Sequence, residues 1–426
     1  MSSRVAALSL LLLATTSPAL AQLQKGEQAT AEQVAAGEVP AEKISEDEVA
    51  LRALQPGVTA PSWNAEAAQD LLAYVQRIGE EGLDPADYTP DRLQAAIAAG
   101  DQLALDTIAT DVFLRISSDL ALGHVRGDAR MDWHVGDQED LSPSTQMELM
   151  NRAIANRSVQ DSLNSLLPTH PQYGELKALL HTATTKELRD KARTNLDRWR
   201  WLPRELGPRY VIVNVPAYTV ALVENGQVVA RHKAVVGAPK TATPQLTATV
   251  TGVILNPWWE IPKSIEPEVR GKKGYVRVKT PEGGYRYRQP PGAGNALGRM
   301  KVVMPNNYAI YLHDTPSKSA FKRDARALSH GCIRTENPLD FAALLLDNPE
   351  WDRAAINRAI AEGKTVKADA TTPTPVYITY FTTAALAEGA GIISYPDIYK
   401  RDDTVVTALN AQSGTTQVAA AKTGAP

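Results

Sequence analysis

The hydrophobic pattern of the chain changes its period near Pro203, and this change limits the fold more than any other feature of the sequence. Before it, from about residue 63 to residue 201, apolar residues such as Leu71 and Val75 recur at helical spacing. After it, the segment RYVIVNVPAYTVALVENGQVVARHKAVVG alternates and is rich in β-branched residues, with an Asn-Gly pair that is typical of a type I′ hairpin turn. The sequence therefore predicts an α+β multidomain protein, in which an all-α region precedes a mostly β domain.

Local signals predict individual elements inside these regions. Further strands are expected at 246–255, 308–313 and 374–381, and helices at 338–346 and 351–362. In the helical region, Thr89 before a proline indicates a helix N-cap, and a Thr145–Glu148 pair resembles a capping box.

The first residues, MSSRVAALSLLLLATTSPALAQ, have the layout of a secretory signal peptide. Arg4 supplies a positive charge, residues 5–14 form an apolar stretch too short to span a bilayer, and the small residues up to Ala21 fit a cleavage site. We therefore expect export to an oxidising, extracytoplasmic space, with cleavage after Ala21 and no transmembrane span in the mature chain. An uncleaved anchor or a buried N-terminal helix is the alternative.

The domain division that follows from these patterns has five parts. We expect a signal peptide at 1–21, a flexible linker at 22–60, a helical domain at 61–202, a mostly β domain at 203–402 with a short basic insertion at about 263–290, and a disordered tail at 403–426.

The chain contains one cysteine, Cys332, in the segment ALSHGCIRTENP. A single cysteine cannot form an internal disulfide, and the polar residues next to it argue against a position in the core. A lone thiol with histidine nearby is a candidate nucleophile, since the thiolate is the reactive form and an imidazole can take the proton. His313 and His330 are the two candidates for the base. We favour His313, because it closes a predicted strand and can face the loop that carries the thiol. A thiolate–imidazolium pair stabilised by about three pK units would require about 4 kcal/mol.

The other residues of the segment suggest how a reaction at this thiol could be supported. The backbone N–H groups of Gly331 and Cys332 could hold the negative charge of an oxyanion, and one such donor is worth about 3 kcal/mol. Arg334 could bind a substrate carboxylate, or form a surface salt bridge with Glu336.

Charge is balanced over the whole chain, with 45 Lys and Arg against 48 Asp and Glu, so that nothing favours nucleic-acid binding. It is uneven locally. From Lys263 to Arg334 there are 15 Lys and Arg against 5 Asp and Glu. This excess is either an ordinary basic loop face or a surface that attracts a carboxylate-bearing substrate.

The segments YLHDTPSKSAF and ALSHGCIR resemble the catalytic signature of the L,D-transpeptidases with a YkuD-type domain, in which a histidine precedes an S-H-G-C-hydrophobic-R block. NPWWEIPKSI, RQPPGAGNALGRMKVVMPN and PVYITYF are similar to segments of the larger, YcbB-like branch, and GLDPADY is similar to part of its helical scaffold domain. The resemblance runs from about Trp63 to Asp402.

This resemblance implies a periplasmic enzyme that crosslinks peptidoglycan and takes part in cell-wall organisation and cell shape. The residue matching Cys332 would attack the bond between residues 3 and 4 of a donor stem peptide, with His313 as general base, and D-alanine would leave. A diaminopimelate amine of an acceptor stem would then form a 3→3 crosslink. Partners would be the two stem peptides, with other envelope enzymes as further candidates. No metal or organic cofactor is implied, and carbapenems would acylate the thiol. The residues expected to form the oxyanion site or to support Cys332 and His313 are Gly331, Tyr311, Ser329 and His330. The expected substrate-binding residues are Arg334, Lys272, Lys273, Arg286 and Arg288.

Four other outcomes stay open. The same acyl-enzyme resolved by water would make the protein an L,D-carboxypeptidase or a hydrolase, and transfer to another amine would attach a protein to the wall. A zinc hydrolase that uses His313, His330 and Cys332 is a rival from another class, although their spacing fits no common zinc pattern. A non-catalytic envelope scaffold with a vestigial site is the non-enzymatic alternative.

Overall fold

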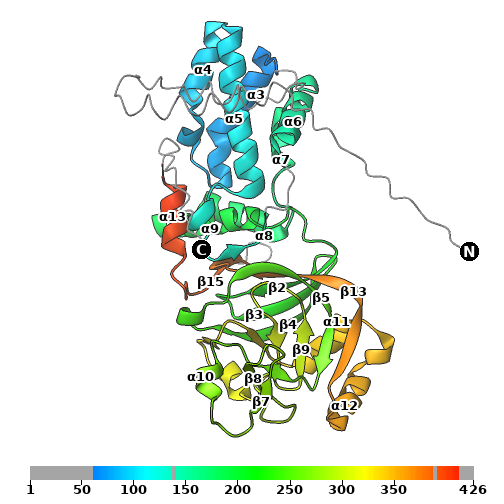
Figure 1. The fold of residues 1–426 in the computed structure, drawn as a ribbon. Helices are drawn as coiled ribbons and strands as arrows, with labels where there is room; N and C mark the ends of the chain where they lie inside the picture. Colours follow the sequence, from blue (N-terminus) through cyan, green and yellow to red (C-terminus); the bar gives the residue numbers. More distant parts are fainter. Residues whose placement is uncertain (1–60, 137–140, 387–390, 412–426) are drawn as a thin grey trace, which may run out of the picture. The chain divides into compact units, whose positions relative to one another are not determined.

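The computed structural model describes residues 61–136, 141–386 and 391–411 (Figure 1). The expected signal peptide and linker lie outside these residues. The described residues all belong to one compact unit of the chain. Among them, no helix is long and apolar enough to cross a membrane.

The N-terminal region is helical, as its apolar spacing predicts. Leu71 and Val75 on one helix pack against Phe113 and Ile116 on another, and all four are buried. The helices of this region are α3 (Ala65–Arg77), α4 (Pro90–Ala99), α5 (Gln102–Leu122), α6 (Pro143–Ala155), α7 (Val159–Asn164), α8 (Pro171–Thr182) and α9 (Lys186–Arg200), with short 3₁₀ turns η1 (Ile78–Glu81), η2 (Pro85–Tyr88) and η3 (Gly127–Ala129).

Two of the expected helix starts differ in their cap. Helix α4 begins at Pro90, but Thr89 has a φ of 45° and its side chain makes no capping bond. Helix α6 begins at Pro143, so Thr145 is already inside it, and the capping oxygen belongs to Ser142. The capping box at Thr145 and Glu148 was therefore wrong. A nearer Ser-Pro pair supplied the stronger start signal.

The C-terminal region is built on a ten-stranded sheet in the order β1-β5-β13-β2-β3-β4-β12-β10-β9, with β11 paired to β4. Strand β9 also pairs with β5, so the path returns to its beginning and closes like a barrel. The strands of this sheet are β1 (Trp133–His134), β2 (Arg209–Asn214), β3 (Thr219–Glu224), β4 (Gln227–Gly237), β5 (Gln245–Leu255), β9 (Met300–Val303), β10 (Leu312–His313), β11 (Ala327–Ser329), β12 (Ile333–Thr335) and β13 (Val366–Thr379).

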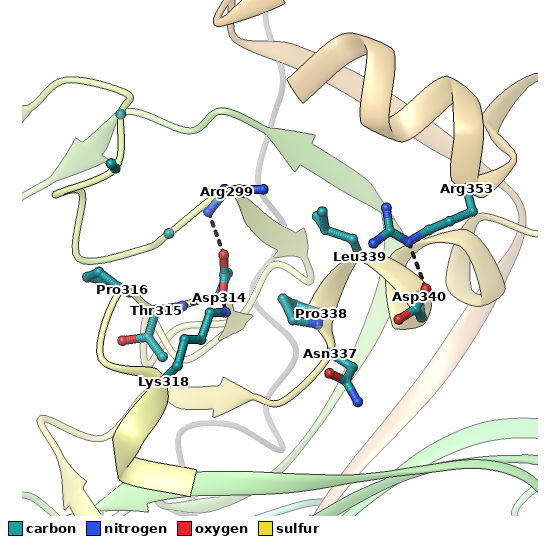
Figure 2. Close-up of a pocket in the computed structure, with 13 residues that line it drawn as sticks. Arg299, Asp314, Thr315, Pro316, Lys318, Asn337, Pro338, Leu339, Asp340 and Arg353 are labelled. Atoms are coloured by element: carbon teal, nitrogen blue, oxygen red, sulfur yellow. Dashed lines mark hydrogen bonds and ion pairs between the residues drawn. The ribbon is translucent and has the colours of Figure 1, made fainter. Parts of the chain in front are cut away.

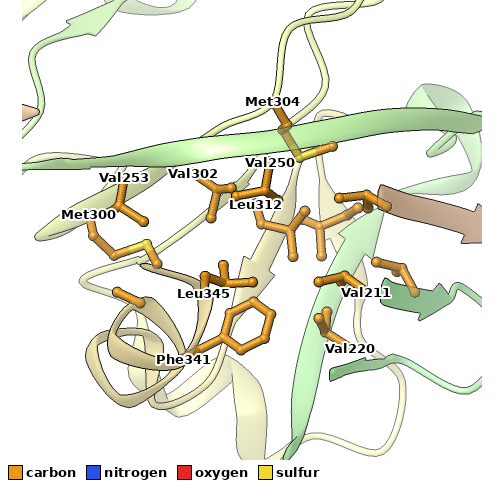
Figure 3. Close-up of a cluster of buried hydrophobic side chains, with 14 of the residues drawn as sticks. Val211, Val220, Val250, Val253, Met300, Val302, Met304, Leu312, Phe341 and Leu345 are labelled. Carbon is orange, nitrogen blue, oxygen red and sulfur yellow. The ribbon is translucent and has the colours of Figure 1, made fainter. Parts of the chain in front are cut away.

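The interior of this closed sheet is apolar, and helix α11 (Pro338–Leu346) covers it. Figure 3 shows Phe341 and Leu345 of α11 among strand residues such as Val211, Val250 and Val302. Further elements of the region are α12 (Arg353–Glu362), η4 (Pro239–Thr241), η5 (Lys318–Lys322) and η6 (Pro349–Trp351). The expected α+β organisation, a helical region followed by a mostly β domain, is confirmed.

A small antiparallel sheet of order β6-β8-β7 forms the basic insertion, which we call the cap. It begins slightly before the expected residue 263, because Trp259 and Glu260 already pair with the last strand of the insertion. The elements of the cap are β6 (Trp259–Glu260), α10 (Glu266–Val269), β7 (Val276–Lys279) and β8 (Tyr285–Gln289).

The C-terminal segment differs from the expected tail at 403–426. After the hairpin of β14 (Thr383–Ala385) and β15 (Ile392–Ser394), the chain forms helix α13 (Asp402–Leu409). Val405 and Leu409 of α13 are buried against Val125 and Trp201. The polar and Ala-rich composition hid this short amphipathic helix, whose two apolar residues lie one turn apart.

Candidate active site

Cys332 lies in the turn between β11 and β12, and several bonds fix this turn. The hydroxyl of Ser329 donates to the Cys332 carbonyl at 2.5 Å and accepts from the Gly331 N–H at 3.2 Å. Gly331 has a φ of 110°, a conformation that favours glycine. Because Ser329 already binds the Gly331 N–H, this amide is not a free oxyanion donor, contrary to the sequence-based expectation.

The carbonyl of Gly331 is held from the other side by Thr243. The Thr243 hydroxyl donates to that carbonyl at 2.7 Å, and the Thr243 N–H donates to the Tyr399 hydroxyl at 3.1 Å. The ring of Tyr399 carries the Arg401 guanidinium 5.0 Å from its centre, and Arg401 pairs with Asp132 at 2.7 Å. A chain of polar contacts therefore runs from the helical region to the backbone beside the thiol.

The pairing of β10 with β12 puts His313, Tyr311 and Cys332 on one face. The two strands are parallel, with Leu312 opposite Ile333, so Tyr311 comes opposite Cys332. Side chains alternate along a strand, so Tyr311 and His313 point to the same side, and residues in register across two strands do so as well. The rings of Tyr311 and His313 are 5.6 Å apart, and the Cys332 thiol donates a hydrogen bond to the Ala309 carbonyl at 3.5 Å.

The tautomer of His313 suits a base. Its Nδ1 lies 2.5 Å from the Asp314 carbonyl, which can only accept, so Nδ1 carries the proton and Nε2 is free to accept one. His313 is 5% exposed, and burial together with the charge of Arg334 lowers the pKa of His313 to about 3. The imidazole is therefore neutral at neutral pH.

The thiol is neutral as well. Burial raises the pKa of Cys332 above its usual value, although hydrogen bonds from Tyr311 and the charges of Lys301 and Arg334 act in the opposite direction. The resting pair is a thiol and a neutral imidazole rather than the expected thiolate–imidazolium pair. A sulfur in this resting state would need to lose its proton to a base before or during any attack.

Two residues that the sequence did not single out complete this face. Trp259 of the cap lowers the pKa of Tyr311, against the larger effect of burial, and Lys301 of β9 lies 3.8 Å from the centre of the Tyr311 ring. Lys301 is directly opposite His313 in the sheet. Both residues stand in segments quoted above, NPWWEIPKSI and RQPPGAGNALGRMKVVMPN. Nothing in these segments marks them as neighbours of Tyr311, because pairing between strands far apart in the sequence brings Lys301 there.

Of the remaining expected residues, Arg334 lies beside His313, whereas His330 contacts the cap. Arg334 lies in register with His313, and its buried Nε has no hydrogen-bond partner among the residues that the structure describes. His330 is half exposed, and its Nε2 lies 3.2 Å from Glu268 of α10, so the structure assigns it to the cap and not to the sulfur.

The four basic residues of the cap that were expected to bind substrate differ in whether they form ion pairs. Lys272 and Lys273 are exposed. Arg286 and Arg288 instead form ion pairs with Glu260, at 3.8 Å and 2.6 Å. Of these four residues, Lys272 and Lys273 are the two without an ion pair in the described part of the chain, so their charges can attract a substrate at long range.

Within the described part of the chain, no three His, Cys, Asp or Glu side chains gather closely enough to share a metal ion. The zinc alternative therefore lacks a set of ligands there.

The closed sheet carries a neutral thiol and a neutral imidazole on one face, and this combination can be compared with known catalytic domains. Residues 208–378 match the model of the L,D-transpeptidase catalytic domain (YkuD), and residues 52–180 match that of the Scaffold domain. A Haemophilus influenzae protein named "Putative L,D-transpeptidase" is 27% identical over 379 residues, covering 80% of this chain and 76% of that protein. The chain belongs to the L,D-transpeptidase family, with a scaffold domain before its YkuD-type catalytic domain.

Solved structures give weaker similarities. An L,D-transpeptidase from Mycobacterium smegmatis is 19% identical over 40% of this chain and 58% of its own, with a TM-score of 0.24. L,D-transpeptidase 3 from Mycobacterium tuberculosis, in complex with a faropenem-derived adduct, is 16% identical over 40% of this chain and 60% of its own, with a TM-score of 0.23. The matches span less than two thirds of these solved chains, and they are too weak to assign a function.

Proposed function

We propose that the protein is a peptidoglycan L,D-transpeptidase that forms 3→3 crosslinks. The observation that carries this proposal is the shared face of Cys332, Tyr311 and His313, which the parallel pairing of β10 with β12 brings into register, inside the segment that matches the catalytic domain. Export to the periplasm, cleavage after Ala21, and the five-part domain division stay proposals of the sequence.

In the first half-reaction, the Cys332 sulfur attacks the carbonyl carbon of residue 3 in the donor stem. His313 Nε2 takes the thiol proton and delivers it to the departing nitrogen of D-alanine, so that the C–N bond breaks and a thioester forms. The hydroxyl of Tyr311, a residue that stands opposite Cys332 in register and whose pKa is raised by burial, is the donor that we assign to the developing oxyanion.

In the second half-reaction, a diaminopimelate amine of the acceptor stem attacks the thioester carbonyl. The C–S bond breaks, an amide forms, and the amine proton returns to the sulfur through His313. Water in place of the amine would give hydrolysis, and the amine of a protein would give attachment to the wall.

Product analysis tests the proposal. Full-length protein incubated with tetrapeptide muropeptides is expected to release D-alanine and yield dimers with the mass of a 3→3 crosslink, whereas Cys332→Ala yields neither. Shortened monomers without dimers would replace transfer by hydrolysis. Dimers from Cys332→Ala, or a lack of any carbapenem adduct on the wild-type protein by intact mass, would contradict the assignment of the nucleophile.

The exposed lysines of the cap should attract the acidic stem peptides. Reversing both charges, as Lys272→Glu with Lys273→Glu, is expected to raise the apparent KM several-fold at low ionic strength with little change in kcat, since it acts on encounter. The effect should shrink at high salt. The matched control is Lys364→Glu, an exposed lysine outside the cap. Equal KM values for the cap variant and the control would show that the cap lysines do not contact the substrate.

A further inference from the structure

A cavity of about 450 Å³ lies beyond the ends of β10 and β12, and the proposed chemistry does not use it. Its walls come from the segment 314–318 after β10, from 337–340 after β12, from 292–299 before β9, and from Arg353 of α12 (Figure 2).

The cavity is separate from the sulfur. Strands β10 and β12 are parallel, Cys332 stands before the first residue of β12, and Asn337 in the cavity wall follows its last. Five residues of roughly extended chain span about 16 Å. The thiol and the cavity therefore lie at opposite ends of the same two strands, at a distance that a peptide of about five residues can bridge.

The charges of the wall favour an anion. Two carboxylates face the cavity and both are occupied: Asp314 accepts from Lys318 and from the backbone N–H of Arg299 at 2.8 Å, and Asp340 pairs with Arg353 at 2.7 Å. The guanidinium of Arg299 is exposed and makes no hydrogen bond or ion pair with any residue that the structure describes. Three cations against two anions line the cavity, and the unengaged one is Arg299.

The rest of the wall suits a short aliphatic or peptide group. Pro338 and Leu339 form an apolar surface, and Figure 2 shows them between Arg299 on one side and Arg353 on the other. A guanidinium beside an apolar surface fits a carboxylate on a small hydrocarbon or peptide stem, since the fork binds both carboxylate oxygens.

The wall is also joined to the base. Asp314 contributes its carboxylate to the cavity and its carbonyl to Nδ1 of His313. Gly298 packs so closely on that carboxylate that a Cβ there would lie 2.4 Å from it. A ligand bound at Arg299 would rest against the segment that orients the imidazole.

We propose that this cavity binds a carboxylate of the acceptor peptide, with Arg299 as the main contact, while the amine of the same peptide reaches the thioester at Cys332. This inference rests on the proposed transferase function and adds the place where the second peptide is held.

Binding can be tested without catalysis. In the full-length Cys332→Ala protein, a pentapeptide stem, long enough to span from the cavity to residue 332, is expected to bind at least tenfold more weakly when Arg299→Glu is added, as measured by calorimetry. The matched control is Arg358→Glu, the same charge reversal on an exposed arginine of α12 that does not line the cavity, and it should bind like the parent. N-acetyl-D-alanine should compete with the pentapeptide, whereas its amide should not.

Equal affinity in the Arg299 and Arg358 variants, or equal competition by the acid and its amide, would overturn the proposal. With Cys332 present, Arg299→Glu should also lower the ratio of crosslinked dimers to hydrolysed monomers about tenfold, and an unchanged ratio would count against it. If the wild-type protein formed no thioester at all, the proposed function would fail, but the binding comparison would still decide whether the cavity is a carboxylate site.

Discussion

Replacing His313 with alanine is expected to slow thioester formation at Cys332 by about a thousandfold, the size of effect that a general base commonly has. The reason is that thiol and imidazole are both neutral at rest, so the sulfur cannot attack until a base removes its proton. The rate of acylation by a carbapenem, followed by intact mass, measures this step without an acceptor.

His330→Ala is the control, because it removes an imidazole that contacts Glu268 of the cap instead of the sulfur. Its rate should stay within about threefold of the wild type, as exposed polar contacts contribute little. The wild-type rate should also show no loss with a midpoint near pH 6.5, since His313 stays neutral down to about pH 3. A His313→Ala protein that keeps a tenth of the rate, or a His330 variant that loses as much, would remove His313 from the mechanism.

The same buried imidazole makes the fold sensitive to acid. The pKa of His313 is about 3 in the folded protein, whereas an unfolded chain has a histidine pKa of about 6.5. Between these values the unfolded chain binds the proton more readily, so stability falls as the pH falls through this window, by at most about 1.4 kcal/mol per pH unit for this one group. Melting temperatures of His313→Gln should therefore decline less between pH 6.5 and pH 4 than those of the wild type.

Gly237→Ala is expected to destabilise the protein by about 3 kcal/mol, because the added methyl group meets main chain that cannot move aside cheaply. A Cβ on Gly237 would lie 2.1 Å from the Thr241 carbonyl oxygen and 2.7 Å from the Thr243 nitrogen. The melting temperature should fall by roughly 6–12 °C. Since the Gly237 N–H donates to the Thr243 hydroxyl that holds Gly331, the acylation rate should fall as well, even well below the melting temperature.

Gly174→Ala is the matched control for this substitution. Gly174 is exposed in α8, and a Cβ there would meet nothing within 4 Å. Alanine is the better helix former by about 1 kcal/mol, so this variant should be as stable as the wild type or slightly more so. A Gly237→Ala protein that melts with the wild type would show that the Thr241–Thr243 segment yields easily.

Local chemistry explains which elements could be read from the sequence. The Asn225-Gly226 hairpin is confirmed, because a type I′ turn needs positive φ at both positions and these residues have φ of 48° and 77°. The strand expected at 308–313 is confirmed only for its last two residues. The side chain of Asn306 binds both the N–H and the carbonyl of Ile310, which takes this segment out of the sheet, and no propensity signals such a contact.

Some residues of the site could also be singled out from the sequence, and others could not. Cys332 and His313 stand in a compact signature, so the sequence singled them out, and their roles stay predictions. Trp259, Lys301 and Thr243 reach the site only through strand order, and Arg286 and Arg288 were assigned to substrate because their partner Glu260 is invisible as such in a sequence. The number of charged residues can be counted in a sequence, but which of them form ion pairs with each other depends on the fold.

The chain of contacts from Asp132 through Arg401 and Tyr399 to Thr243 has a practical meaning for anyone who transplants or trims this enzyme. Asp132, Tyr399 and Arg401 all fall outside residues 208–378, the part that relatives share as the catalytic domain. A fragment limited to residues 208–378 would therefore keep Cys332 but lose Asp132, Tyr399 and Arg401, the outer contacts that hold Thr243 and the backbone beside the thiol.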